Sequence, residues 1–164
     1  MLELSCSVKR WTQRIAWSLV TAVGLVQHQV AAAQVIPTNM RSINAAEGPA
    51  ALGGYSQAVE LRNPRRLLYI SGQIPVDIEG RTPSEFAAQC RLVWTNVAAQ
   101  LHAANMSLEN LVKVTTFLSD RRHAAENSRI RREILGEHAP ALTIVITEIY
   151  DSRWLLEIDA IAAE

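Results

Sequence analysis

The chain has 164 residues, and its 16 Lys and Arg balance 16 Asp and Glu, so the formal net charge is zero. This length suits one domain with a sizeable core, and the balanced charge disfavours nucleic-acid binding, which depends on clustered cationic side chains. Hydrophobic residues make up 49% of the chain, which excludes disordered and low-complexity classes, and two cysteines, Cys6 and Cys90, are too few for a disulfide scaffold or a zinc site.

Residues 1–33 have the layout of a secretory signal peptide. Basic side chains precede an apolar run, Ile15 to Val26, and Ala31-Ala32-Ala33 supplies a small-residue cleavage site. The run is shorter than the roughly 18 to 20 residues that cross a bilayer, so no permanent membrane anchor is expected. This interpretation predicts a periplasmic or secreted domain of residues 34–164. Alternatively, Met40 is the true start and the protein is cytoplasmic.

The next segments predict a β-hairpin followed by a helix. Ser56 to Leu61 alternates in polarity, Asn63-Pro64 marks a turn, and Leu67 to Ile70 is a short apolar run. Thr82-Pro83-Ser84-Glu85 has the pattern of a capping box that begins a helix, which is expected to end near Asn105. Its apolar stripe has spacings of three and four, which predicts one core-facing side: Phe86, Cys90, Val93, Trp94, Val97 and Leu101.

The second half of the chain predicts a strand, a charged helix and two more strands. Val112 to Leu118 is rich in β-branched residues, and Ser119-Asp120 caps a helix that runs to about Glu137. This helix is predicted to present a solvated face, because its arginines alternate with glutamates: Arg121, Arg122, Arg129, Arg131 and Arg132 with Glu126, Glu133 and Glu137. Leu142 to Ile149 and Leu155 to Ile161 read as strands.

The resulting order, β-β-α-β-α-β-β, predicts a two-layer α+β domain with two helices on one face of the sheet. Leu142, Ile144 and Ile146 alternate with Thr143, Val145 and Thr147, so both faces of this strand are apolar or β-branched. We therefore expect a neighbouring subunit to cover the second face of the sheet. The alternative is an ordinary half-exposed strand.

Motifs of the common hydrolases, zinc proteases, P-loop proteins and dinucleotide-binding proteins are missing from the sequence. Three polar positions remain candidates for chemistry: Tyr55, Ser71-Gly72-Gln73 and Glu157. Each also has a structural reading, as a packed aromatic, a bend after a strand and a solvent-facing carboxylate.

Four stretches in order resemble the Rid/YjgF family of reactive-intermediate deaminases: residues 48–59 (GPAALGGYSQAV), 70–77 (ISGQIPVD), 112–120 (VKVTTFLSD) and 157–162 (EIDAIA). The resemblance implies a chorismate-mutase-like fold, a homotrimer with ligand sites between subunits, and cofactor-free hydrolysis of imines or enamines such as 2-aminoacrylate. It assigns Glu157 to the attacking water and the remaining pocket positions to Tyr55, Ser71, Gly72, Asn127, Leu142 and Thr143.

One position departs from the family pattern. Active deaminases carry an arginine directly after the Pro-Ala that opens this strand, where Pro140-Ala141 is here followed by Leu142. An arginine binds a carboxylate through two parallel charge-assisted hydrogen bonds, and loss of such a partner costs roughly 2 to 5 kcal/mol. Arg153, Arg65 and Arg66 are the candidate replacements.

Three functions therefore remain open. The first is an imine or enamine hydrolase with altered substrate preference, and the second is a non-catalytic trimer that binds a small metabolite. The third is an RNA-cleaving or chaperone-like protein, which the neutral charge disfavours for RNA.

Overall fold

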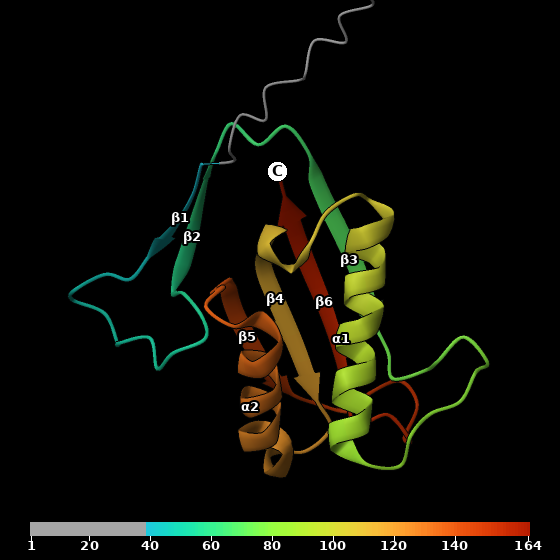
Figure 1. The fold of residues 1–164 in the computed structure, drawn as a ribbon. Helices are drawn as coiled ribbons and strands as arrows, with labels where there is room; N and C mark the ends of the chain where they lie inside the picture. Colours follow the sequence, from blue (N-terminus) through green and yellow to red (C-terminus); the bar gives the residue numbers. More distant parts are fainter. Residues whose placement is uncertain (1–38) are drawn as a thin grey trace, which may run out of the picture. The chain divides into compact units, whose positions relative to one another are not determined.

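The computed structural model describes residues 39–164, so the predicted signal peptide lies outside the described residues. A four-stranded mixed sheet has the order β3-β6-β4-β5, and two helices cover one of its faces, which confirms the two-layer α+β fold (Figure 1). The elements of this sheet and its cover are β3 (Leu67–Gln73), α1 (Phe86–Ala103), β4 (Leu111–Leu118), α2 (Ala124–Leu135), β5 (Ala141–Ile146) and β6 (Leu156–Ala163).

The core lies between the helices and the sheet. The whole apolar stripe predicted for the first helix is buried, including Cys90 and Trp94, and it packs against alternate residues of the two central strands, such as Val114 and Ile158. Burial of each such aliphatic or aromatic side chain contributes roughly 1.5–3 kcal/mol. Helix α1 ends at Ala103, and Asn105 follows in the left-handed conformation with φ 58°, close to the predicted end.

The predicted hairpin is wrong, and an additional strand precedes it. β2 (Ala58–Arg62) pairs with β1 (Asn39–Ile43) in a separate two-stranded sheet, whereas β3 pairs antiparallel with β6. The amides of Arg65 and Arg66 both donate to the carbonyl of Glu164, so the turn is held at the end of β6. Adjacency in the chain indicated two strands, but the long apolar β6 offers β3 a better partner.

The capping box does not form. Helix α1 begins at Phe86, and the preceding Glu85 is extended without a side-chain cap. Gln89 in the first turn explains the difference, because its Nε2 donates to the carbonyls of Pro83 at 2.7 Å and Arg153 at 2.9 Å. The capping segment is therefore tied to the loop before β6 and does not begin the helix.

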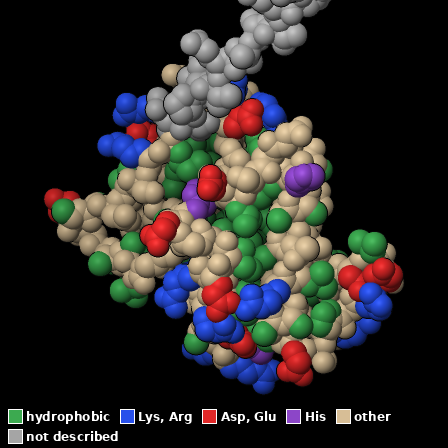
Figure 2. Space-filling model, viewed as in Figure 1, with side chains coloured by type: hydrophobic (Ala, Val, Ile, Leu, Met, Phe, Trp, Pro, Cys, Tyr) green, Lys and Arg blue, Asp and Glu red, His purple; other side chains and the backbone are tan. Residues whose placement is uncertain are grey.

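The second helix is charged outside and partly polar inside. Asp120 caps a short 3₁₀ turn by accepting from the Arg122 amide, and α2 follows. Arg129 pairs with Glu126 and Glu133, as expected for a solvated face, and charges of both signs alternate over this end of the molecule (Figure 2). For Arg131 the prediction is wrong, since this side chain is only 3% exposed.

Residues 39–164 contain neither a candidate membrane-spanning helix nor a candidate metal-ion cluster. No helix there combines the length and hydropathy needed to cross a bilayer. Within the same residues, no group of three or more His, Cys, Asp or Glu side chains has the geometry of a metal site.

Candidate functional site

Ser71, Gly72 and Glu157 come together at an irregularity between β3 and β6. Ile70 pairs with Ala160 and Gln73 with Ile158, so β3 holds one more residue than β6 over this interval, which is a β-bulge. The carboxyl group of Glu157 lies directly over Gly72. A Cβ atom at position 72 would lie 2.6 Å from Cδ and 3.0 Å from Cγ of Glu157, and closer still to Oε1. Glycine is therefore required for this carboxylate position.

The environment of Glu157 favours its protonated form. Burial raises the pKa of the Glu157 carboxyl above its usual value, and the negative charge of Asp159 on the same strand face raises it further. Lys113 of β4 shares this face. Burial lowers the pKa of Lys113, Asp159 partly opposes that shift, and the ammonium contacts the hydroxyl of Thr143. A carboxyl group with a raised pKa suits proton transfer near neutral pH.

Tyr55 and Leu142 lie near the start of β5, and Asn127 is buried on α2. Ser56 donates from its amide to Pro140 and from its hydroxyl to the Ala139 carbonyl, so Tyr55 is held beside the entry to this strand. Leu142 pairs with Val114 and packs toward the helix-covered core. Asn127 is buried on α2, where its Oδ1 lies 3.9 Å from the Cys90 thiol.

One chain does not bring all the predicted residues into one site. Glu157 pairs with Phe117 and Leu142 with Val114, so their backbones are two strand spacings apart across the sheet and three residues apart along it, roughly 14 Å in all. Their side chains also point to opposite faces, because Leu142 faces the core whereas Glu157 faces away from it. The predicted residues thus form two groups, with Ser71, Gly72 and Glu157 in one and Tyr55 and Leu142 in the other. Asn127 is buried beside Cys90, and Thr143 lies opposite Leu142 on the open face.

Comparison with known proteins agrees with the fold and with the placed motifs. The sequence model of the family described as Endoribonuclease L-PSP matches residues 45–164. The chain belongs to this family. The 2-iminobutanoate/2-iminopropanoate deaminase of Escherichia coli K12 is 34% identical over 126 residues, which cover 74% of this chain and 96% of the relative.

Solved structures give the same assignment. A Rid-family protein of unknown function from Yersinia pestis has a TM-score of 0.68 at 26% identity, over 77% of this chain and 99% of the other. Escherichia coli TdcF with bound serine has a TM-score of 0.57 at 32% identity, over 76% of this chain and 98% of the other. The Rid/YjgF resemblance is therefore confirmed.

Three arginines were candidates to take over the role of the arginine missing at position 142, and each is paired with a carboxylate in this Rid-family chain. Arg153 makes a two-point contact with Asp151, with Nη2 2.7 Å and Nε 3.1 Å from its carboxylate oxygens. Arg65 and Arg66 both lie beside Glu164, at 3.6 and 3.3 Å. Each of these cations therefore already has a carboxylate partner.

Sequence reasoning missed Arg131. Its Nε and Nη1 are buried without a hydrogen-bond partner among the described residues. The pattern contained a signal, because Arg131 follows Asn127 by four residues and precedes Leu135 by four, on the helix side that Ile130 also buries. The alternation of arginines with glutamates instead predicted a solvated position for this side chain.

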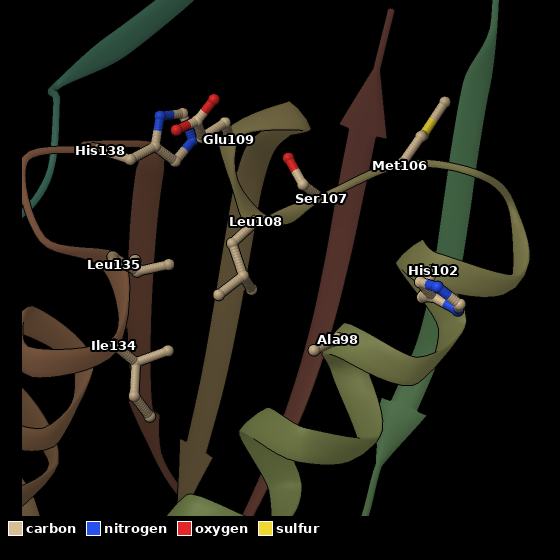
Figure 3. Close-up of a pocket in the computed structure, with 9 residues that line it drawn as sticks. All are labelled: Ala98, His102, Met106, Ser107, Leu108, Glu109, Ile134, Leu135 and His138. Carbon is tan, nitrogen blue, oxygen red and sulfur yellow. The ribbon is translucent and has the colours of Figure 1, made fainter.

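A separate groove of about 650 Å³ lies between the two helices and the short 3₁₀ turn Leu108–Asn110 (Figure 3). Its lining is Ala98, His102, Met106, Ser107, Leu108, Glu109, Ile134, Leu135 and His138. None of the predicted site residues lines it. The His138 ring is held at 2.7 Å from the Leu111 carbonyl, so it is engaged in the fold.

Proposed function

We propose that this protein hydrolyses reactive imines or enamines to a carbonyl compound and ammonia, and that its substrate is anchored differently because Leu142 replaces the family arginine. The observation that carries the proposal is the Glu157 carboxyl group seated over Gly72, with its pKa raised by burial. The name of the Escherichia coli relative, which describes a deaminase of 2-iminobutanoate and 2-iminopropanoate, supports the same reaction class.

In the proposed reaction, a water oxygen adds to the imine carbon while Glu157 accepts a proton from that water. Glu157 then returns the proton to nitrogen, which gives a carbinolamine. Glu157 transfers the second proton from the hydroxyl oxygen to nitrogen in the same way, and the C–N bond breaks during this transfer. Ammonia leaves, the C=O bond remains, and one water is consumed. The reaction requires no cofactor.

The proposed catalytic unit is a homotrimer. The two groups of site residues in one chain are separated across the sheet, so a second copy is needed to complete a pocket around a small imine. The sheet face opposite the helices also carries apolar side chains, with Tyr69 72% exposed and Phe117 and Ile161 half-buried. Packing of these faces against one another removes that apolar surface from water.

A second candidate function is supported by Leu142. Without an arginine at this position, a trimer could retain the pocket for a weakly polar metabolite and lack turnover. Such a protein would show ligand-induced stabilisation that follows mass action, with no product formed.

The test generates imines from several amino acids with an oxidase and lets the protein compete with semicarbazide for them. We expect the full-length chain to lower semicarbazone formation, Glu157→Gln to abolish this effect, and Leu142→Arg to widen the range of imino acids used. Hydrolysis that is unchanged in Glu157→Gln refutes the assigned role. Turnover by Leu142→Arg alone favours the binding function. Cleavage of a labelled single-stranded RNA, weakened by salt, would replace the imine proposal by a nuclease function.

A further inference from the structure

Arg131 is a buried cation with no counterion among residues 39–164. It is 3% exposed, and the ionisable groups that act on its guanidinium are Arg132, Tyr55 and Cys90, none of which is a carboxylate. Removing a guanidinium from water without a paired anion is strongly unfavourable, and arginine stays protonated in proteins. An anion that reached this side chain would therefore relieve an unfavourable buried charge.

Further donors occupy neighbouring positions. The Nδ2 of Asn127, one helical turn earlier on the same face of α2, is also buried without a hydrogen-bond partner among residues 39–164. The backbone of Gly54 also lies near this guanidinium, since a Cβ atom at position 54 would be 3.8 Å from Nη2 of Arg131. Tyr55, the next residue in the chain, carries a phenol that acts on the charge of Arg131. A guanidinium, an amide and a phenol form a donor set that suits a carboxylate.

The segment that carries Gly54 and Tyr55 leads to the start of β5. Gly54 and Tyr55 lead into Ser56, whose amide donates to the carbonyl of Pro140 and which bridges to Ala141, the residue before Leu142. The guanidinium of Arg131 thus lies beside the segment that leads into the start of β5, the strand that carries Leu142.

We propose that Arg131, together with the Asn127 amide, binds the carboxylate of an α-imino acid substrate and so replaces the arginine that is missing at position 142. The inference rests on the proposed function and identifies its substrate class. The carboxylate binds to the Arg131 group of one copy, and the imine carbon faces the Glu157 group of a neighbouring copy. Arg131 is a binding residue and takes no part in proton transfer.

The kinetic test compares two imines of similar size. An amino acid oxidase supplies 2-iminobutanoate from 2-aminobutanoate, and an amine oxidase supplies the imine of propylamine, which has no carboxylate. For Arg131→Met we expect kcat/KM to fall about 30-fold or more with 2-iminobutanoate, mainly through KM, and to change less than about twofold with the neutral imine. Arg129→Met is the matched control, because this exposed arginine is on the same helix and pairs with Glu126 and Glu133. Leu142→Arg in the Arg131→Met background should restore binding of the imino acid.

A binding measurement separates this inference from the proposed function. Calorimetric titration with 2-oxobutanoate, a stable carboxylate of the same skeleton, needs no turnover. Binding that Arg131→Met abolishes supports the inference even when no imine is hydrolysed. Equal hydrolysis of 2-iminobutanoate by the variant and the native protein overturns the inference while the proposed function stands. If the native protein neither binds 2-oxobutanoate nor hydrolyses the imines, both the inference and the proposed function are refuted.

Light scattering and thermal melting test the competing role of Arg131 as an ion-pair partner for a second copy. Since no described residue pairs with the cation, Arg131→Met should leave the ligand-free melting temperature unchanged or higher, and the oligomer intact. Dissociation of the oligomer, or a large drop in melting temperature, would assign Arg131 to the subunit interface and overturn the inference. Arg131→Lys, which keeps the charge but loses the planar fork, should bind 2-oxobutanoate more weakly than the native protein.

Discussion

Replacement of Gly72 by alanine adds one methyl group directly beneath the Glu157 carboxyl group. The new Cβ would lie 2.6 Å from Cδ and 3.0 Å from Cγ of Glu157, whereas ordinary contact begins near 3.4 Å. The carboxyl carbon must therefore move by at least about 0.8 Å, and its nearer oxygen by more. Because the obstructing atoms belong to a flexible side chain, Glu157 rather than the backbone is expected to move.

A displacement of about 1 Å in a reacting group costs on the order of 100-fold in rate, or about 2.7 kcal/mol in activation free energy. We expect Gly72→Ala to lower kcat for imine hydrolysis by about this factor. The backbone at Gly72 has no positive φ, so alanine is not strained there and the melting temperature should change little. The assay is oxidase-coupled imine hydrolysis with semicarbazide, together with a thermal melt.

Gly48→Ala is the matched control, because its nearest atom would be the Ala45 carbonyl oxygen at 3.5 Å, an ordinary contact. It should leave both rate and melting temperature unchanged. If Gly72→Ala retains full activity in a folded protein, the Glu157 position over Gly72 is irrelevant to the reaction and the reasoning fails. If Gly72→Ala loses activity only because the protein unfolds, glycine at position 72 is needed for the fold and not for the position of Glu157.

Three other predictions concern pH, thiol reactivity and stability. As the base, Glu157 works only when deprotonated, so the activity should fall as the pH drops through its raised pKa. Asp159→Asn removes a like charge and should move this acidic limb of the pH–rate profile to lower pH. Burial raises the pKa of the Cys90 thiol to about 12, so in a Cys6→Ser background Ellman's reagent should react only after unfolding, and rapid native reaction would contradict this. Gln89→Leu leaves three backbone groups unpaired and should lower the free energy of unfolding by about 3 kcal/mol or more in urea; a loss below 1 kcal/mol would show that these bonds are replaced.

Local patterns predicted what depends on local forces. The stripe from Phe86 to Leu101 has a helical period, and all of it is buried. The β-branched run near Val114 became a central strand, and Asn105 adopted the left-handed conformation that ends a helix. Motif order identified the family, because the residues of those motifs are close together in the chain.

Pairing and burial of polar side chains depended on distant parts of the chain. β3 pairs with the last strand rather than with its neighbour in sequence, since β6 offers a long apolar ladder. The capping segment before α1 was overridden by Gln89, whose partners include the Arg153 carbonyl. No pattern within a few residues contains either contact.

The same division holds for the candidate site. From the sequence alone came the family, the proposed role of Glu157 and the missing arginine at Leu142, because residue identity within a motif requires no coordinates. Only the tertiary structure placed the Glu157 carboxyl group over Gly72 and buried Arg131 with no counterion in the part of the chain that it describes. Both arrangements arise where separate elements meet, β3 with β6 and α2 with the segment before β2. The free energy of an unpaired charge depends on what surrounds it, which the order of residues does not specify.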